Sequence, residues 1–498
     1  MVRLTHARWL LVGAVGLSGC ANVPLRGSQQ PSREALSLYM RGLMLEKSAQ
    51  LPSALDVYQQ VLEHDYHSPF LHVRIGATHV KLGQPDQALK SFQRALTLEP
   101  THRDALRWVA MLHTSQGRIQ EAIKAYERLI EQEPTDRFVL STLADLYVLQ
   151  GELAKAIELY ERLIREHGPS GPLHFNLGVL YGRLSEFSTA IEELSRALEL
   201  DPDSLEVRVV LGLTYELNQK PIQAAAHYEE AIRLDPLNPR LYHHAARVYV
   251  NQHRLTEAIQ HYQTALDLAP SDLEAIIGLV RLWILDKQFA QAQRLLAMKL
   301  ATLGDSPELY LMLGLLYREA NAPDEAVRAF ERAIALQEDS AQAHFYLGAQ
   351  LERLHLEQEA RRELRRAIEL DPNHADALNY LGYMDAEDGI NLQEAKSLIE
   401  RALALDPDNG AYVDSLGWVY YQLGDVEEAI RQLERAAKLL DTDPIVFDHL
   451  GDAYFKRGDV EKAQAAWEKA TDLDPDLEAV KRKLESLRTQ EATVIGHP

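Results

Sequence analysis

Cysteine is nearly absent from this 498-residue chain, which has only Cys20. One cysteine cannot form an internal disulfide, and no Cys/His cluster has the spacing of a zinc site. A glycine-rich phosphate loop and a His-Glu-x-x-His pair are absent as well. The nearest approaches to metal spacing are His64 with His67 and the adjacent His243 and His244, and neither pair has an evident third ligand. We therefore predict a protein that is not an enzyme and holds no metal or cofactor.

The chain also lacks an excess of positive charge. Its formal net charge is −22, whereas binding to a nucleic-acid backbone needs a basic stripe. Hydrophobic residues make up 46% of the chain and charged residues 25%, a balance typical of a folded, soluble chain. We interpret the acidity as a solvated outer face, and we expect neither nucleic acid nor a small molecule as the ligand.

A long apolar run is missing at the N-terminus, where Trp9–Leu17 is too short to span a bilayer permanently. This run follows Arg3 and Arg8 and leads into Leu17-Ser18-Gly19-Cys20. The order of positive residues, short apolar run and small residues before a cysteine resembles a bacterial lipobox. The resemblance implies a signal peptide over residues 1–19 and lipid attachment at Cys20, with two acyl chains (palmitate or similar) to hold the protein on a membrane.

The residues that follow Cys20 bear on the destination. Ala21 stands where lipoproteins of the inner membrane typically carry aspartate, so the resemblance implies the outer membrane, with the protein on the periplasmic side. The alternative is an ordinary secretory signal or a short anchor helix, with Cys20 incidental. Residues 20–34 are rich in Pro, Gly, Ser and Gln, which predicts a flexible tether.

A 34-residue period runs through the rest of the chain. In its last full copy, Phe447 to Pro475, two amphipathic helical patterns are joined at Gly458. The small residue of the second pattern recurs at steps of 34, with one step of 35, as Ala54, Ala88, Ala122, Ala156, Ala190, Ala224, Ala258, Ala292, Ala326, Ala360, Ala395, Ala429 and Ala463. Gly42, Gly76, Gly178, Gly314 and Gly451 are among the small residues of the first pattern, which we expect to face these alanines so that paired helices approach closely. Such a period predicts stacked helix pairs that are stable only as an array.

These residues resemble the tetratricopeptide repeat (TPR) family, and with the lipobox they resemble its bacterial outer-membrane lipoproteins. The resemblance implies an all-α fold, a right-handed α-solenoid of about 13 helix-turn-helix units over residues 35–475. We expect a capping helix over residues 476–488 and a disordered tail over residues 489–498. Irregular boundaries near residues 168–172, 304–307 and 386–391 are candidate joints, or they only alter the local twist.

In this family the first helix of each unit lines a concave groove. Carried over by position, the groove residues of this chain are Trp108, Phe138, Phe175, Asn176, Arg240, His243, Arg247, Arg281, Phe345, Tyr346 and Tyr380. Aromatic anchors with a cationic middle suit a peptide or protein segment, because arginine binds carboxylates bidentately. Two alternatives are that the aromatic residues are interlayer core and that Glu206, Glu274 and Glu308 neutralise the cations.

The resemblance implies a non-enzymatic scaffold for protein–protein interaction. We expect it to hold a protein or peptide of the cell envelope in its groove and to contact the membrane through its N-terminal lipid. Assembly of a pilus or secretin, of outer-membrane proteins, or of an exopolysaccharide exporter are the implied roles. The alternative is an adaptor or regulator of a periplasmic peptidase or cell-wall hydrolase. An enzyme or carbohydrate binder is a third class.

Overall fold

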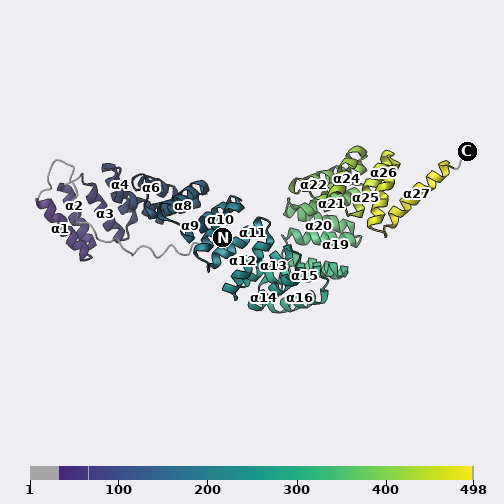
Figure 1. Ribbon diagram of the computed structural model, residues 1–498, viewed down its shortest axis with the longest axis horizontal. Coiled ribbons are helices and arrows are strands. Elements are labelled where there is room, and N and C mark those ends of the chain that lie inside the picture. The colour runs from purple at the N-terminus through teal and green to yellow at the C-terminus, as the bar shows by residue number, and fades with distance from the viewer. Residues whose placement is uncertain (1–32, 65–66, 496–498) are drawn as a thin grey trace. The chain divides into compact units, whose positions relative to one another are not determined.

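The computed structural model describes residues 33–64 and 67–495, with side chains to Leu487. These residues form 27 α-helices and no strand (Figure 1). The predicted signal peptide, Cys20 and the tether up to residue 32 lie outside the described residues. The chain divides into two units, Met1–Lys220 and Pro221–Pro498, and each is described by itself.

The first unit contains eleven of these helices. They are α1 (Arg33–Lys47), α2 (Leu51–His64), α3 (Pro69–Lys81), α4 (Pro85–Leu98), α5 (Arg103–Ser115), α6 (Ile119–Gln132), α7 (Arg137–Gln150), α8 (Leu153–His167), α9 (Gly171–Arg183), α10 (Phe187–Leu200) and α11 (Leu205–Leu217).

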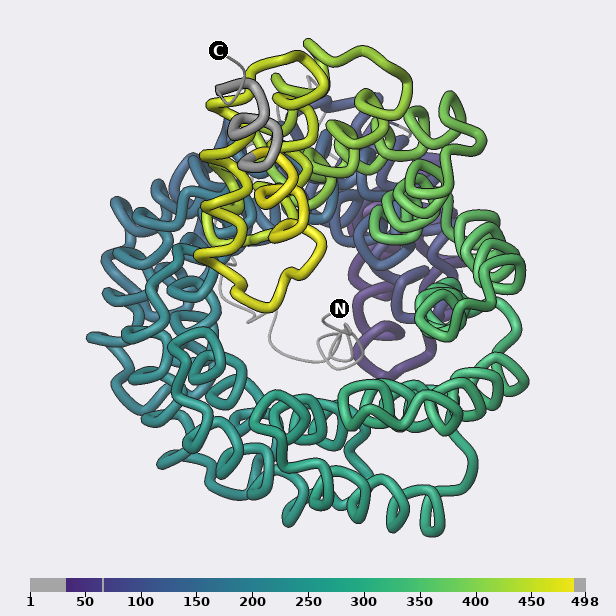
Figure 2. Tube along the Cα trace, turned by 90° about the vertical axis from the view of Figure 1, so that its right-hand side faces the viewer, coloured from purple at the N-terminus to yellow at the C-terminus, as the bar shows by residue number. Residues whose placement is uncertain are grey.

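The second unit contains the remaining helices, which follow one another in chain order along the teal-to-yellow trace of Figure 2. They are α12 (Pro221–Leu234), α13 (Pro239–Asn251), α14 (Leu255–Leu268), α15 (Leu273–Leu285), α16 (Phe289–Leu303), α17 (Pro307–Glu319), α18 (Pro323–Leu336), α19 (Ala341–Arg353), α20 (Glu357–Leu370), α21 (Ala375–Glu387), α22 (Leu392–Leu405), α23 (Gly410–Leu423), α24 (Val426–Leu439), α25 (Pro444–Arg457), α26 (Val460–Leu473) and α27 (Glu478–Ile495). The odd-numbered helices up to α25 are the first helices of the repeat and the even-numbered ones are the second helices, as the 34-residue period predicts. The chain is therefore an all-α solenoid of helix-turn-helix units.

Glycines of the first helices let the two helices of a pair pack closely. A Cβ added at Gly76 would lie 2.6 Å from Cε1 of Phe92, and one added at Gly382 would lie 2.7 Å from Cγ1 of Ile399. The backbone of the recurring alanine is also near, since the carbonyl oxygen of Ala395 would be 2.9 Å from that second Cβ. The prediction that these glycines face the alanines is thus incomplete, because each also receives a large buried side chain from one turn farther along the second helix.

The turn between the two helices of each unit has a residue with left-handed backbone at the same place in the repeat. Glycine fills it at Gly83, Gly117, Gly151, Gly389, Gly424 and Gly458, and other residues fill it at Ala49, Ser185, Gln219, His253, Lys287, Asn321 and His355. Left-handed backbone costs a non-glycine residue about 1–2 kcal/mol. The turn geometry is therefore set by the repeat and not by the local residue alone.

The C-terminal helix α27 packs against the last repeat. Val480, Leu484 and Leu487 are buried and pack with Trp467 in one hydrophobic cluster. The helix continues to Ile495, whereas we predicted a disordered tail from residue 489. A backbone that is already helical through the buried seam propagates at little cost per residue, which accounts for the longer helix.

The predicted joint near residues 386–391 is held by a buried ion pair. Arg361 of α20 donates from Nε to Asp385 at 2.8 Å and also contacts Asp388. Asn391 donates to the other oxygen of Asp385 at 3.2 Å. The boundary between the two compact units is at Lys220/Pro221, and whether the three candidate boundaries are joints stays a prediction. Proline also opens α4 and α18, so Pro221 gave no signal that distinguishes this boundary.

Candidate protein-interaction surface

The predicted groove residues all lie on first helices, on α5, α7, α9, α13, α15, α19 and α21. Neighbouring first helices contact one another, as α3 does with α5 and as α15, α17, α19, α21, α23 and α25 do in succession. Within the described residues, neighbouring second helices make no contacts of that extent. In each unit the first helices therefore form the inner side of the local curvature. We call the side of this row that points away from the second helices the first-helix face.

Two aromatic residues that we predicted for the groove in the first unit are partly core. The indole of Trp108 stacks on Phe92 of the second helix before it, with ring centroids 5.7 Å apart and planes 4° from parallel. Phe175 packs against the buried cluster around Leu194 and Leu211. Each ring therefore packs between layers on one side, as expected if these aromatic residues belong to the core. Contact of the rest of the ring with a partner stays a prediction.

Asn176 lies near a buried phenol. Burial and the carboxylate of Asp145 raise the pKa of Tyr160, and Asn176 opposes that shift. Tyr160 donates to Asp145. The amide of Asn176 therefore belongs to a polar cluster beside the first-helix face, and its role as a groove residue stays a prediction.

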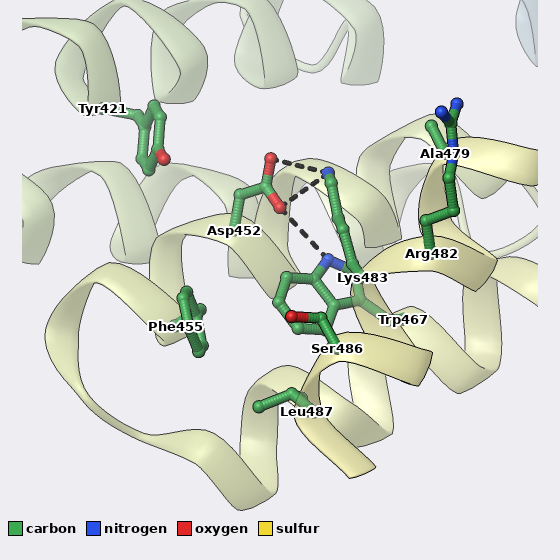
Figure 3. A pocket seen from close by; sticks show the side chains of 9 residues that line it. All are labelled: Tyr421, Asp452, Phe455, Trp467, Ala479, Arg482, Lys483, Ser486 and Leu487. Atoms are coloured by element: carbon green, nitrogen blue, oxygen red, sulfur yellow. Dashed lines mark hydrogen bonds and ion pairs between the residues drawn. The ribbon is translucent and has the colours of Figure 1, made fainter. Parts of the chain in front are cut away.

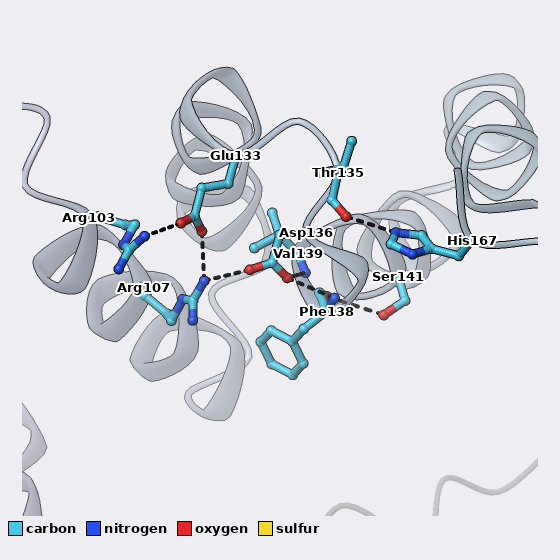
Figure 4. Close-up of polar contacts among 9 residues, drawn as sticks. All are labelled: Arg103, Arg107, Glu133, Thr135, Asp136, Phe138, Val139, Ser141 and His167. Carbon is cyan, nitrogen blue, oxygen red and sulfur yellow. Dashed lines mark hydrogen bonds and ion pairs between the residues drawn. The ribbon is translucent and has the colours of Figure 1, made fainter. Parts of the chain in front are cut away.

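Phe138 is the exposed aromatic residue of this set, with 49% of its surface accessible. Beside it, Arg107 donates to Glu133 at 2.8 Å and to Asp136 at 2.6 Å (Figure 4). Arg103 also pairs with Glu133. The cations here are already neutralised, so this stretch of the face offers an apolar ring and not a free positive charge.

The basic middle of the face has exposed arginines on two successive first helices. Arg247 of α13 and Arg281 of α15 are exposed. Both act on the phenol of Tyr262, whose pKa is raised by burial and by the carboxylate of Glu274 and lowered by these two arginines. Arg240, in the first turn of α13, is exposed as well. Within the described residues, neither Arg240 nor Arg281 forms an ion pair. Glu274, which the alternative expects to neutralise these cations, places its carboxylate 3.6 Å from Nδ1 of His243.

His243 itself is an interlayer side chain. It is 9% exposed, and its Nε2 lies 3.2 Å from Oδ2 of Asp272, the residue that caps α15. Its ring meets Tyr262 edge-on at 5.8 Å. A side chain so enclosed helps to position two repeats against each other. Among the predicted groove residues, His243 has the least support from the geometry as a direct contact with a partner.

Phe345, Tyr346 and Tyr380 form one aromatic cluster. The ring of Phe345 lies 5.2 Å from that of Tyr346 and 6.0 Å from that of Tyr380. Tyr346 also stacks on the buried Phe330 at 5.9 Å, so the cluster is continuous with the core. All three residues are half-buried, so part of each remains accessible.

A cavity of about 410 Å³ lies where α27 meets the last repeat (Figure 3). Its lining residues are Tyr421, Asp452, Phe455, Trp467, Ala479, Arg482, Lys483, Ser486 and Leu487. Asp452 accepts from Lys483 at 2.8 Å and from the indole of Trp467 at 3.2 Å. Our site predictions did not include this cavity, because half of its wall belongs to a helix outside the repeat period.

The described residues contain no group of three or more His, Asp or Glu side chains placed to hold a metal ion. Among those same residues, no helix combines the length and the apolar character that crossing a membrane requires.

Comparison with protein families gives matches to three models of the tetratricopeptide repeat. The first matches residues 73–137, 175–239, 209–272 and 311–354, the second residues 113–177, 252–316 and 387–448, and the third residues 444–477. Comparison with curated proteins gives no match.

Similar solved structures include Tom70 from yeast, with 17% identity over 92% of this chain and 100% of that chain and a TM-score of 0.46. The APC/C hetero-tetramer Cut9–Hcn1 has 16% identity over 92% of this chain and 96% of that chain, with a TM-score of 0.45. MamA has 23% identity over 33% of this chain and 91% of that chain, with a TM-score of 0.32. From the paired helices and the repeat-by-repeat family matches, the chain is a tetratricopeptide-repeat protein, a scaffold for protein–protein interaction.

Proposed function

We propose that this scaffold is anchored by lipid at Cys20 in the bacterial outer membrane, faces the periplasm, and assists assembly of an envelope machine. It does so by holding a segment of another envelope protein on its first-helix face. The observation that carries the binding role is the exposure of Arg247 and Arg281 on the successive first helices α13 and α15, in a chain of net charge −22. Two exposed guanidinium groups on adjacent repeats match the carboxylates of an acidic partner segment.

The anchor rests on the sequence of residues 1–20, and it has its own test. Cys20→Ala removes the thiol that accepts the lipid, so the protein should leave the outer-membrane fraction and appear in the soluble periplasmic fraction. Fractionation of cells that express the wild type and the variant measures this. Unchanged retention of Cys20→Ala in the outer membrane would contradict the anchor.

Partner binding is tested by capture from detergent-solubilised envelopes. Arg247→Glu with Arg281→Glu should reduce capture of an envelope protein, because the partner's carboxylates then meet like charge. The matched control is Arg294→Glu with Arg365→Glu, which makes the same charge change on exposed residues of second helices. Equal capture by both double variants would remove the arginine pair from the proposal.

The identity of the captured protein separates the candidate roles. A secretin, a β-barrel or an export component supports assembly of an envelope machine. A peptidase or cell-wall hydrolase supports the alternative role of adaptor or regulator instead.

A further inference from the structure

The first helices α21, α23 and α25 surround a second, smaller cavity of about 230 Å³. It is lined by Asn379, Tyr380, Tyr383, Ala411, Asp414, Ser415, Leu440, Asp443, Ile445 and Val446. Sites for small molecules usually have volumes of about 300–1,000 Å³. This cavity is below that range, and its size matches a single long side chain.

The charge around the cavity is negative. Asp414 lies 3.0 Å from the imidazole of His449, and Asp443 caps α25 through a backbone N–H without a cationic partner among the described residues. Besides burial, which is the main cause, Glu387 and Asp414 raise the pKa of Tyr383 in the cavity wall. Two carboxylates, Asp414 and Asp443, therefore line the cavity, and only Asp414 has a basic partner, the imidazole of His449, among the described residues.

Asn379 adds an acceptor that lacks a donor. Its Oδ1 is buried and takes part in no hydrogen bond within the described structure. A buried acceptor without a partner costs about 1–3 kcal/mol, so an occupant that donates a hydrogen bond there is favoured. The rings of Tyr380 and Tyr383 complete the wall, and aromatic faces attract cations.

An acceptor without a donor, aromatic walls and carboxylates together match an ammonium or guanidinium group, which offers only donors. We propose that this cavity binds a lysine or arginine side chain of the partner segment, an inference that rests on the proposed role of the first-helix face. The partner segment would then carry a basic residue for this cavity as well as acidic residues for Arg247 and Arg281. Because the cavity and the two arginines lie on different repeats, these two features fix which stretch of the segment lies on which repeat.

The test uses a single-residue probe and the full mature chain in detergent. N-acetyl-lysine methylamide and its uncharged counterpart N-acetyl-norleucine methylamide are titrated, and binding is followed by saturation-transfer difference NMR. Asp443→Asn removes one charge from the cavity while an asparagine still caps α25. The control is Asp425→Asn, which makes the same change at the cap of α24, outside the cavity lining.

We expect the lysine probe to bind more tightly than the norleucine probe. Asp443→Asn should weaken the lysine probe about fivefold, the upper end for a partly exposed ion pair, while Asp425→Asn leaves its affinity unchanged. Equal affinity for the two probes, or equal loss in the two variants, overturns the cavity proposal.

The outcome is separable from that of the proposed function. Failure of lysine selectivity while the wild type still captures an envelope protein overturns the cavity alone. Lysine selectivity without capture of any envelope protein supports the cavity and contradicts the proposed function.

Discussion

Gly178 and Gly182 give a matched pair of substitutions on one helix, α9. In an exposed helix interior, Gly→Ala usually stabilises a protein by about 1 kcal/mol. At Gly178, however, the new Cβ would lie 2.5 Å from Cγ of Leu194 and 3.2 Å from the carbonyl oxygen of Ala190. At Gly182 it would meet nothing within 4 Å. The same methyl group is thus added once against the core and once into open space.

The contact at Gly178 sets the magnitude. Carbon atoms attract best at about 3.5–4.0 Å, so the two helices must separate by about 1 Å, and Leu194 is fully buried and cannot turn away. Overpacking of this kind costs about 1–3 kcal/mol. We therefore expect Gly178→Ala to lower the free energy of unfolding by about 1–3 kcal/mol and Gly182→Ala to raise it by up to about 1 kcal/mol.

Urea unfolding followed by circular dichroism measures these changes, together with hydrogen exchange of α9 and α10, because repeat arrays open locally as well as globally. A double variant supplies the check: Gly178→Ala should cost much less when Leu194 is already alanine, since the methyl group then fills the space that the leucine leaves. Equal effects of Gly178→Ala and Gly182→Ala would refute the packing explanation.

Three further predictions concern the second unit. Lys287→Gly should raise the free energy of unfolding by about 0.5–1 kcal/mol in urea titrations, because φ is +55° at this residue and glycine adopts such backbone without steric cost. Burial lowers the pKa of His449, but the carboxylates of Asp414, Asp448 and Glu387 together outweigh burial and raise it above the ordinary value. The stability that these interactions contribute is therefore fully present below the unfolded-state pKa of about 6.5 and is lost as the pH rises through the folded-state pKa. The difference in free energy of unfolding between wild type and His449→Gln should therefore decrease as the pH rises through that range. Arg361→Met should cost about 3–5 kcal/mol, measured by thermal and urea unfolding, because it leaves Asp385 charged and buried without its cation; a cost under 1 kcal/mol would contradict the role of this pair.

The period of the sequence predicts most of the fold. A small residue every 34 positions is enough to place both helices of each unit, because only a stacked array buries the apolar faces that this spacing creates. The large side chain that packs against each of these glycines is harder to assign from the sequence. Phe92, for example, stands four residues after the recurring Ala88, and its contact with Gly76 depends on how far the two helices are rotated about their axes.

The surface was less predictable from sequence. Trp108 and Phe138 are both aromatic residues of first helices, yet the first stacks on Phe92 and the second is exposed. Charge was equally ambiguous, since Arg107 is paired with acidic residues of the next connection, while Arg281 pairs with none in the described chain. Such pairings join repeats whose relative placement the 34-residue pattern does not specify.

The most direct measurement of the central claim is photo-crosslinking in intact cells. A benzoylphenylalanine at position 281, on the first-helix face, is compared with one at position 365, on the outer second helix α20. The account predicts a crosslink from position 281 to one envelope protein in the outer-membrane fraction, and none from position 365. Crosslinks to that protein from position 365 alone would contradict it.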